Sequence, residues 1–174
     1  MEDETQLAPL EPEADSPDGY DAEPADEASP EHQFCVFRAG RERFCLPVLD
    51  VEEVVDWPLV TRLPLAPPYL LGIFNLRGSV VPLVDIAFTE SRRPGLLPKQ
   101  VVVASLREPR AGEDVRIGIA ADEVIGTHLI SEPAVLEAAP GDLPHCRGML
   151  RHGDRLALAL DLRRLIQVFP APAM

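Results

Sequence analysis

The apolar positions of this chain fall into short runs separated by turn-forming residues, and helical periodicity is almost absent. Runs of this kind are typical of β-strands. Residues 34–38 (FCVFR) and 43–48 (RFCLPV) flank Gly40, whose conformational freedom suits a tight hairpin turn. Because both runs are apolar at consecutive positions, they predict strands that are covered on both faces, as in a small barrel or sandwich.

The same pattern predicts an all-β body with only short helical segments. Further strands are expected at residues 70–76, 79–84, 101–106, 115–120, 146–151 and 155–161. Residues 50–56 (DVEEVVD) are compatible with a turn of helix or with a bent strand, and the sequence leaves both open. Asp161 is placed to cap a short C-terminal helix.

An internal repeat organises these strands. Residues 72–86 (GIFNLRGSVVPLVDI) align without a gap on residues 148–162 (GMLRHGDRLALALDL), at a spacing of 76 residues. Upstream of each segment, residues 46–55 correspond to residues 117–126. We therefore expect two similar β-barrel halves, at approximately 34–90 and 100–169. Halves of about 60 residues bury little core alone, which predicts that they share an apolar interface.

The first 32 residues differ from the body in composition. They hold twelve Asp and Glu residues, no Lys or Arg, and five prolines. Such a segment buries too little apolar surface to offset its ordering entropy, so residues 1–32 are predicted to be a disordered acidic tail and residues 33–170 the folded domain. The tail could be a solvated extension or a lure for a basic partner.

Charge and composition exclude several classes of function. The chain has 29 acidic residues, and the 17 outside the tail face 16 basic ones, so the body is nearly neutral. A nucleic-acid binder needs a surplus of Lys and Arg on one face. No apolar run reaches the roughly 18 residues of a membrane helix, and the acidic N-terminus does not resemble a signal peptide. We expect a cytoplasmic protein that binds no nucleic acid and does not insert into the membrane.

The residues that could carry chemistry do not form a site. His145 and Cys146 are adjacent, and neighbouring side chains of a strand point to opposite faces. Ser79 lacks the glycine pattern of a nucleophile elbow. The spacing of His128, His145 and His152 matches no metal motif. We therefore predict no catalytic residue, no metal and no cofactor. The three cysteines, which are also without metal-type spacing, are expected to be reduced core residues; they are Cys35, Cys45 and Cys146.

One charged pair stands out from the solvated acidic residues of the segment 50–56. Arg77 lies between two apolar runs, where a guanidinium that loses water needs a carboxylate partner, and Glu53 is a plausible one. The alternative is an arginine in a hairpin turn that faces water. The first interpretation predicts a desolvated, hydrogen-bonded Glu53–Arg77 pair.

The segment GIFNLRGSVVPLVDI closely resembles the signature of the CheW-like domain family, the coupling module of bacterial chemotaxis. The resemblance extends from Phe34 to about Phe169 and includes the opening stretch FCVFRAGRERFCLPVLDVEEVVDW. The residues that match the signature are Asn75, Leu76, Arg77, Gly78, Pro82 and Asp85. The acidic tail, the loop after Asp85 and the hairpin insertion LREPRAGEDVR depart from the family pattern, which leaves the choice of partner open.

The resemblance implies a fold of two small five-stranded SH3-like β-barrels that share a hydrophobic core. It also implies a non-enzymatic signalling adaptor that couples the cytoplasmic tip of chemoreceptors to the regulatory domain of a CheA-type histidine kinase, recruited to membrane-associated receptor arrays. Kinase contact would use the barrel ends, and receptor contact a groove between the barrels with Val48, Val51, Glu53 and Arg77. We expect Val48 and Val51 to form an apolar surface patch there. The alternative is a CheW-like protein that binds one array component and localises, caps or sequesters it, in gliding, pilus or array-placement systems.

Overall fold

The computed structural model describes residues 31–88, 97–107, 114–131, 135–137 and 143–169. These ranges form short strands with one 3-10 turn and one α-helix. The elements are β1 (Glu31–Ala39), β2 (Glu42–Pro47), η1 (Val48–Asp50), β3 (Val51–Asp56), β4 (Leu70–Leu76), β5 (Ser79–Val84), β6 (Gln100–Arg107), β7 (Asp114–Ala121), β8 (Glu123–Ser131), β9 (Val135–Glu137), β10 (Cys146–His152), β11 (Arg155–Leu160) and α1 (Leu162–Val168).

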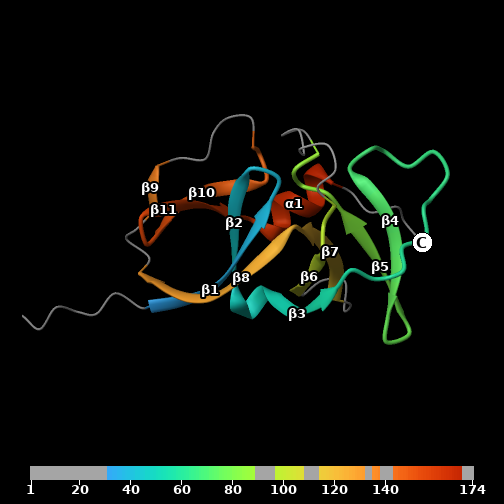
Figure 1. The fold of residues 1–174 in the computed structure, drawn as a ribbon, viewed down its shortest axis with the longest axis horizontal. Helices are drawn as coiled ribbons and strands as arrows, with labels where there is room; N and C mark the ends of the chain where they lie inside the picture. The colour runs from blue at the N-terminus through green and yellow to red at the C-terminus, as the bar shows by residue number, and fades with distance from the viewer. Residues whose placement is uncertain (1–30, 89–96, 108–113, 132–134, 138–142, 170–174) are drawn as a thin grey trace, which may run out of the picture.

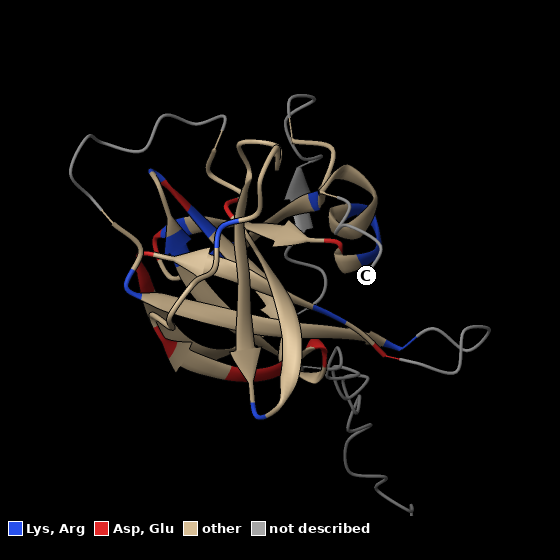
Figure 2. Ribbon diagram, turned by 90° about the vertical axis from the view of Figure 1, so that its right-hand side faces the viewer, with Lys and Arg blue, Asp and Glu red and all other residues tan. Residues whose placement is uncertain are grey.

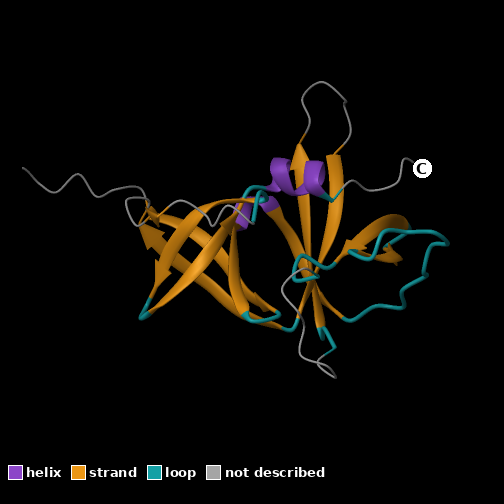
Figure 3. Ribbon diagram, turned by 90° about the horizontal axis from the view of Figure 1, so that it is seen from above, coloured by secondary structure: helices purple, strands orange, loops and turns teal. Residues whose placement is uncertain are grey.

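The strands form two sheets that lie side by side, with α1 at their junction (Figures 1 and 3). The first sheet has the order β8-β1-β2-β11-β10-β9 and is called barrel 1 here. The second has the order β3-β6-β7-β5-β4 and is called barrel 2. The predicted all-β class with two small barrels is confirmed, although barrel 1 carries one short strand more than the expected five.

Most predicted strands lie within the observed ones. The ambiguous segment 50–56 contains both alternatives, because the 3-10 turn η1 ends at Asp50 and β3 follows it directly. The pattern missed β8 and β9. β1 begins at Glu31, so Glu31 and His32 are strand residues and do not belong to the tail. The other residues assigned to the tail lie outside the described part of the chain.

The expected division into halves at 34–90 and 100–169 is wrong as a description of the barrels. Barrel 2 is one continuous stretch from β3 to β7, and it is inserted between β2 and β8 of barrel 1. The parallel pairs explain this arrangement, because β2 pairs with β11 and β5 pairs with β7. Each barrel therefore combines the first hairpin of one repeat with later strands of the other. Strand periodicity does not specify which hairpins pair, so the sequence could not reveal this exchange.

The repeat itself is visible in the details of the pairing. The hairpin of β4 and β5 has a register shift between Leu70 and Gly72, and the hairpin of β10 and β11 has one between Cys146 and Gly148, 76 residues later. The edge of each hairpin is also covered at matching places. Thr61 bridges to Ile73 on β4, and Glu137 of β9 pairs with Met149 on β10. The extra strand of barrel 1 is thus the counterpart of a single bridge in barrel 2.

The buried apolar residues form three clusters, one of which joins the two barrels. One lies in barrel 1 around Phe34 and Leu150, and one lies in barrel 2 around Phe74 and Leu83. The third cluster is the largest and takes side chains from both barrels and from α1, among them Phe44, Ile119 and Leu165. The third cluster is a core that the two small barrels share, as expected from the size of the two halves.

The C-terminal helix and the cysteines follow the sequence predictions. Asp161 is the N-cap of α1, and its side chain accepts a hydrogen bond of 3.0 Å from the backbone N–H of Arg164. The three cysteines are free and buried; they are Cys35, Cys45 and Cys146. Burial raises the pKa of Cys45 and that of Cys146 to about 12, so both thiols are protonated at neutral pH.

Candidate functional site

The residues predicted for receptor binding lie on two neighbouring parts of the chain. Val48 belongs to η1, Val51 and Glu53 follow at the start of β3, and Arg77 occupies the turn between β4 and β5. The structure brings Glu53 and Arg77 together, since Nη2 of Arg77 donates a hydrogen bond of 2.9 Å to Oε2 of Glu53. Figure 2 views the molecule from the barrel 2 side and shows charged residues mainly at strand ends and turns.

The signature tetrapeptide Asn75–Gly78 builds a two-residue hairpin turn. Arg77 has a φ of 52° and Gly78 a φ of 89°, so both central residues have left-handed backbone conformations, as in type I′ turns. The side-chain oxygen of Asn75 accepts a hydrogen bond of 2.8 Å from the N–H of Gly78. Leu76 points into the core of barrel 2. Of the two central residues of the turn, only Arg77 has a side chain, and this side chain is exposed.

The remaining signature residues end the hairpin. Pro82 is buried on β5. Asp85 follows the strand, and its carboxylate accepts a hydrogen bond of 3.0 Å from the N–H of Ala87 while its own N–H donates to the carbonyl of Tyr69. These contacts turn the chain away from the sheet, so Pro82 and Asp85 have local folding roles.

The Glu53–Arg77 pair is not desolvated. The side chain of Arg77 is 79% exposed and that of Glu53 22% exposed, which corrects the expected buried pair. The hairpin turn facing water, the alternative interpretation of Arg77, describes its surroundings better. β3 and β4 form opposite edges of the barrel 2 sheet, so the pair links the two edges. Glu52, the residue before Glu53 on β3, forms a second ion pair with Arg116 of β7, at 2.8 Å.

The apolar surface beside this pair differs from the predicted patch. Val48 and Val51 are only half-buried, and Val51 packs against the core that the barrels share. Leu49, between them in η1, is 96% exposed. Burial raises the pKa of Asp50, the next residue, an effect that the nearby Arg147 opposes and Asp161 supports. We call residues 48–51 the η1 corner; it presents Leu49 as its most exposed apolar side chain.

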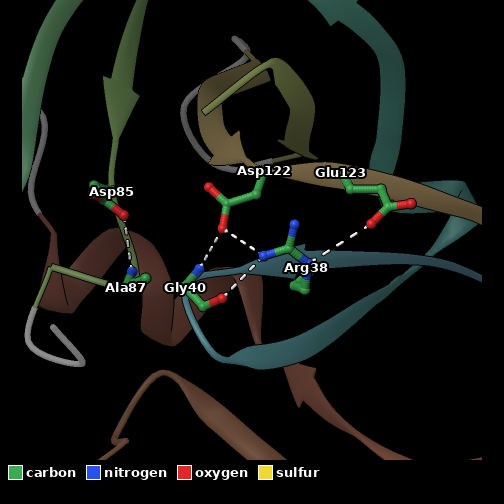
Figure 4. Close-up of polar contacts among 6 residues, drawn as sticks. All are labelled: Arg38, Gly40, Asp85, Ala87, Asp122 and Glu123. Atoms are coloured by element: carbon green, nitrogen blue, oxygen red, sulfur yellow. Dashed lines mark hydrogen bonds and ion pairs between the residues drawn. The ribbon is translucent and has the colours of Figure 1, made fainter. Parts of the chain in front are cut away.

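A buried polar network between the barrels was not foreseen (Figure 4). The carboxylate of Asp122 accepts hydrogen bonds of 2.8 Å from the N–H of Gly40 and 3.1 Å from Nη1 of Arg38. Only 1% of the Asp122 side chain is exposed. Gly40 also lies so close to Ala87 that a Cβ at Gly40 would be 3.0 Å from the Cβ of Ala87. The network joins the β1–β2 turn to the junction of β7 and β8.

A surface groove on barrel 2 was also missed. It has a volume of about 1120 Å³ and is bounded by the segment that connects β3 and β4 together with residues 97–99. Trp57, Leu59 and Leu97 line it and are 39%, 92% and 79% exposed. We call it the Trp57 groove. The sequence signal was present, because Trp57 is the single tryptophan of the chain and is followed by a proline-rich segment.

Two residues that the sequence considered for catalysis lie in the core. His145 and Cys146 are both buried, and burial lowers the pKa of His145. Among the described residues, no group of His, Cys, Asp or Glu side chains is arranged to hold a metal ion. The described part of the chain also contains no helix that is long and apolar enough to cross a membrane.

Comparison with known proteins identifies relatives across the folded body. The family model of the CheW-like domain matches residues 33–169. A probable chemotaxis protein CheW from Rhizobium etli is 27% identical over 137 residues, covering 78% of this chain and 87% of that protein. The protein FrzA from Myxococcus xanthus is 31% identical over 149 residues, covering 82% of this chain and 90% of that protein.

The fold also matches a solved structure. The scaffolding protein TtCheW from Thermoanaerobacter tengcongensis superposes with a TM-score of 0.65, at 24% sequence identity, over 76% of this chain and 85% of that one. This likeness supports the arrangement of two barrels around a shared core.

Proposed function

The chain belongs to the CheW-like domain family, and from this membership we propose that it is a non-enzymatic chemotaxis adaptor that couples chemoreceptors to a CheA-type histidine kinase. The observation that carries the proposal is the extent of the match, because residues 33–169 include both barrels and their shared core. A protein with both barrels offers separate surfaces to two partners. Its place of action would be the cytoplasmic face of membrane-associated receptor arrays.

The proposed mechanism is binding without chemistry. An adaptor that holds receptor and kinase in a fixed geometry transmits a rearrangement of the receptor as a change in the populations of kinase conformations. The shared core suits this role, because side chains of both barrels pack in one cluster and resist independent movement.

We propose that the receptor tip contacts the η1 corner, with the Glu53–Arg77 pair at its border. Leu49 supports this assignment, since an apolar side chain that is 96% exposed contributes little to folding and is available to a partner. Receptor tips are helical, and a helix that packs on a protein surface concentrates its affinity in a few central apolar contacts. Val48 and Val51 would support the corner from beneath, and the kinase domain would contact the barrel ends.

The test mixes the purified protein with a receptor signalling fragment and with the regulatory domain of a CheA-type kinase. A ternary complex by size-exclusion chromatography supports coupling. A single binary complex contradicts it and favours the alternative, a CheW-like protein that caps, localises or sequesters one array component. Leu49→Asp should weaken receptor binding at least tenfold and leave kinase binding unchanged. The matched control is Leu129→Asp, at a leucine of β8 that is 59% exposed and distant in sequence from the corner.

A further inference from the structure

The Trp57 groove has the chemistry of a binding site for an extended, proline-containing segment. Its wall combines Trp57 with four prolines, which are Pro58, Pro67, Pro68 and Pro98. Proline-rich segments bind in apolar grooves lined by aromatic side chains, and their polyproline II helix is already ordered, so it loses little entropy on binding. The exposure of Leu59 and Leu97 leaves apolar surface that a ligand could cover.

The charges of the groove select an acidic ligand. Two cations, Arg62 and Lys99, belong to its lining, and both side chains are exposed. One acidic residue, Asp85, also lines it, but its carboxylate is occupied by the hydrogen bond from Ala87 and the residue is only 6% exposed. Exposed positive charges beside an apolar wall favour a peptide that carries both prolines and carboxylates.

We propose that residues 7–13 (LAPLEPE) of this chain's own N-terminal segment bind in the Trp57 groove. They contain the spacing P-x-x-P at Pro9 and Pro12, which is typical of polyproline II ligands. Leu7 and Leu10 supply apolar side chains, and Glu11 and Glu13 supply charge opposite to that of the groove. The rest of the first 30 residues adds acids and no Lys or Arg, so attraction to the cations would not be offset.

The chain is long enough for this contact. Glu31, where β1 begins, is 18 positions after Glu13, and this stretch spans up to about 60 Å when extended. A compact domain of about 140 residues has a radius of gyration of only about 14 Å. A linker of this length reaches any face of the body, including barrel 2. Tethering also raises the local concentration of the ligand to the order of 1 mM.

This tethering allows a weak contact to be occupied. A peptide that binds in trans with a dissociation constant of about 0.1 mM would be bound about ten times more often than free when tethered. The groove would then be filled in the full chain and opened by removal of the segment. The inference concerns a surface other than the η1 corner and does not depend on the adaptor role.

Trp57 provides the measurement, because it is the single tryptophan of the chain and lies in the groove. We expect acrylamide to quench its fluorescence at least twofold more strongly after deletion of residues 1–30. A synthetic peptide of residues 1–16, added to the deleted protein, should restore protection. The thermal midpoint should stay within a few degrees, which shows that the deletion leaves the fold intact.

Matched variants separate the proposed contact from other effects. In the full chain, Pro9→Ala with Pro12→Ala should raise quenching toward the level of the deletion, whereas Pro17→Ala with Pro24→Ala should not. Arg62→Glu with Lys99→Glu should weaken binding of the 1–16 peptide to the deleted protein at least fivefold. The same reversal at Arg151 and Arg155, two exposed cations of barrel 1, should leave that binding unchanged.

Three results would overturn the proposal. The first is equal quenching of the full and the deleted chain, which would leave the groove open to an external partner. The second is protection that grows with protein concentration, which would indicate a second copy of the chain as the source of the segment. The third is protection that survives the Pro9→Ala and Pro12→Ala changes, which would place the contact elsewhere in the segment.

Discussion

His145 is an ionisable residue in an apolar environment. It is 2% exposed and its ring lies among aromatic rings, with centroids 6.4 Å from Phe44 and 5.3 Å from Phe169. Among the described residues, neither ring nitrogen finds a hydrogen-bond partner. Burial therefore lowers the pKa of His145, because the charged imidazole would lose its water without compensation.

This environment predicts acid sensitivity. In the unfolded chain a histidine takes up a proton below about pH 6.5, while the folded His145 stays neutral to a lower pH. The unfolded state then binds more protons, so the free energy of unfolding falls as the pH drops below about 6.5, by up to about 1.4 kcal/mol per pH unit until the lowered pKa is reached. We expect His145→Phe to flatten this part of the curve in urea unfolding between pH 5 and 8. Parallel curves for both proteins would contradict the assignment.

Asp122 is also buried, but unlike His145 its side chain has hydrogen-bond partners. Asp122→Ala leaves the N–H of Gly40 and the guanidinium of Arg38 without their carboxylate, and we expect a loss of about 3 kcal/mol in the free energy of unfolding. Glu123→Ala is the control, because Glu123 is 64% exposed and lies 3.7 Å from Arg38. It should cost less than about 1 kcal/mol. Equal losses in chemical denaturation would show that burial is not the cause.

For individual residues, the sequence predicts contacts between positions close along the chain better than contacts between distant positions. The pairing of Glu53 with Arg77 was accessible because both flank apolar runs and carry opposite charge, but their exposure depends on the turn, which periodicity does not describe. Asp122 and Arg38 are 84 positions apart, and no local pattern joins them. Leu49 was overlooked because alternation assigns surface positions within a strand, and Leu49 lies in a 3-10 turn.

Among the elements, the hairpin of β4 and β5 contains Gly72, which lets the chain around Thr61 pair with the sheet edge because glycine has no side chain. Gly72 has a φ of 144°, and a Cβ at this position would overlap the carbonyl oxygen of Thr61. That carbonyl accepts a hydrogen bond of 2.9 Å from the N–H of Ile73, and the N–H of Thr61 donates one of 2.8 Å to the carbonyl of Ile73. The edge of β4 is thereby paired at Ile73, where it offers no free backbone groups to another chain.

Gly72→Ala should therefore detach the segment around Thr61 as well as strain the strand. We expect faster amide hydrogen exchange at Thr61 and Ile73 and a loss of at least about 2 kcal/mol in the free energy of unfolding. Gly78→Ala is the control, because its φ of 89° is also strained but a Cβ there would meet no atom within 4 Å. Its exchange rates at Thr61 should match those of the parent protein. If both variants behave alike, backbone strain alone explains the effect.

The elements that the sequence missed share a physical reason. β8 alternates apolar and polar residues weakly and contains Gly126, so it offers neither a strand period nor a continuous apolar run. β9 has three residues, which is below the length at which any pattern is visible. β4 and β5, by contrast, were predicted at their observed bounds, because the turn residues Arg77 and Gly78 separate two clear runs.

For the whole molecule, the repeat spacing predicted two like halves and a shared core; the structure has two barrels and a shared core, but the barrels do not coincide with the predicted halves. The sequence could not tell that barrel 2 is inserted into barrel 1. Whether the barrels are consecutive or one is inserted into the other depends on which parallel strand pairs form. Both arrangements place the same residues in strands. The Trp57 groove was equally hidden, since its wall comes from two segments that meet only after barrel 2 has formed.

The insertion of one barrel into the other has a consequence for the time course of folding. The parallel pair of barrel 2 joins Leu83 to Gly118, whereas that of barrel 1 joins Phe44 to Leu158, a loop about three times longer. Closing the longer loop costs about 1 kcal/mol more in chain entropy. We expect pulsed hydrogen exchange during refolding to protect amides of β6 and β7 before those of β2 and β11; the reverse order would contradict this.

The same order applies to a chain as it leaves the ribosome. Every strand of barrel 2 has been made once Ala121 has been added, while β1 and β2 still lack the partners that β8 and β11 will supply. Synthesis at about 5 to 20 residues per second leaves the N-terminal hairpin waiting for about 2 to 8 seconds before residue 160 is added. During that interval the apolar strands β1 and β2 are exposed on a nascent chain and could associate with those of another chain. The acidic residues that precede β1 would oppose this association, because their negative charges repel neighbouring nascent chains.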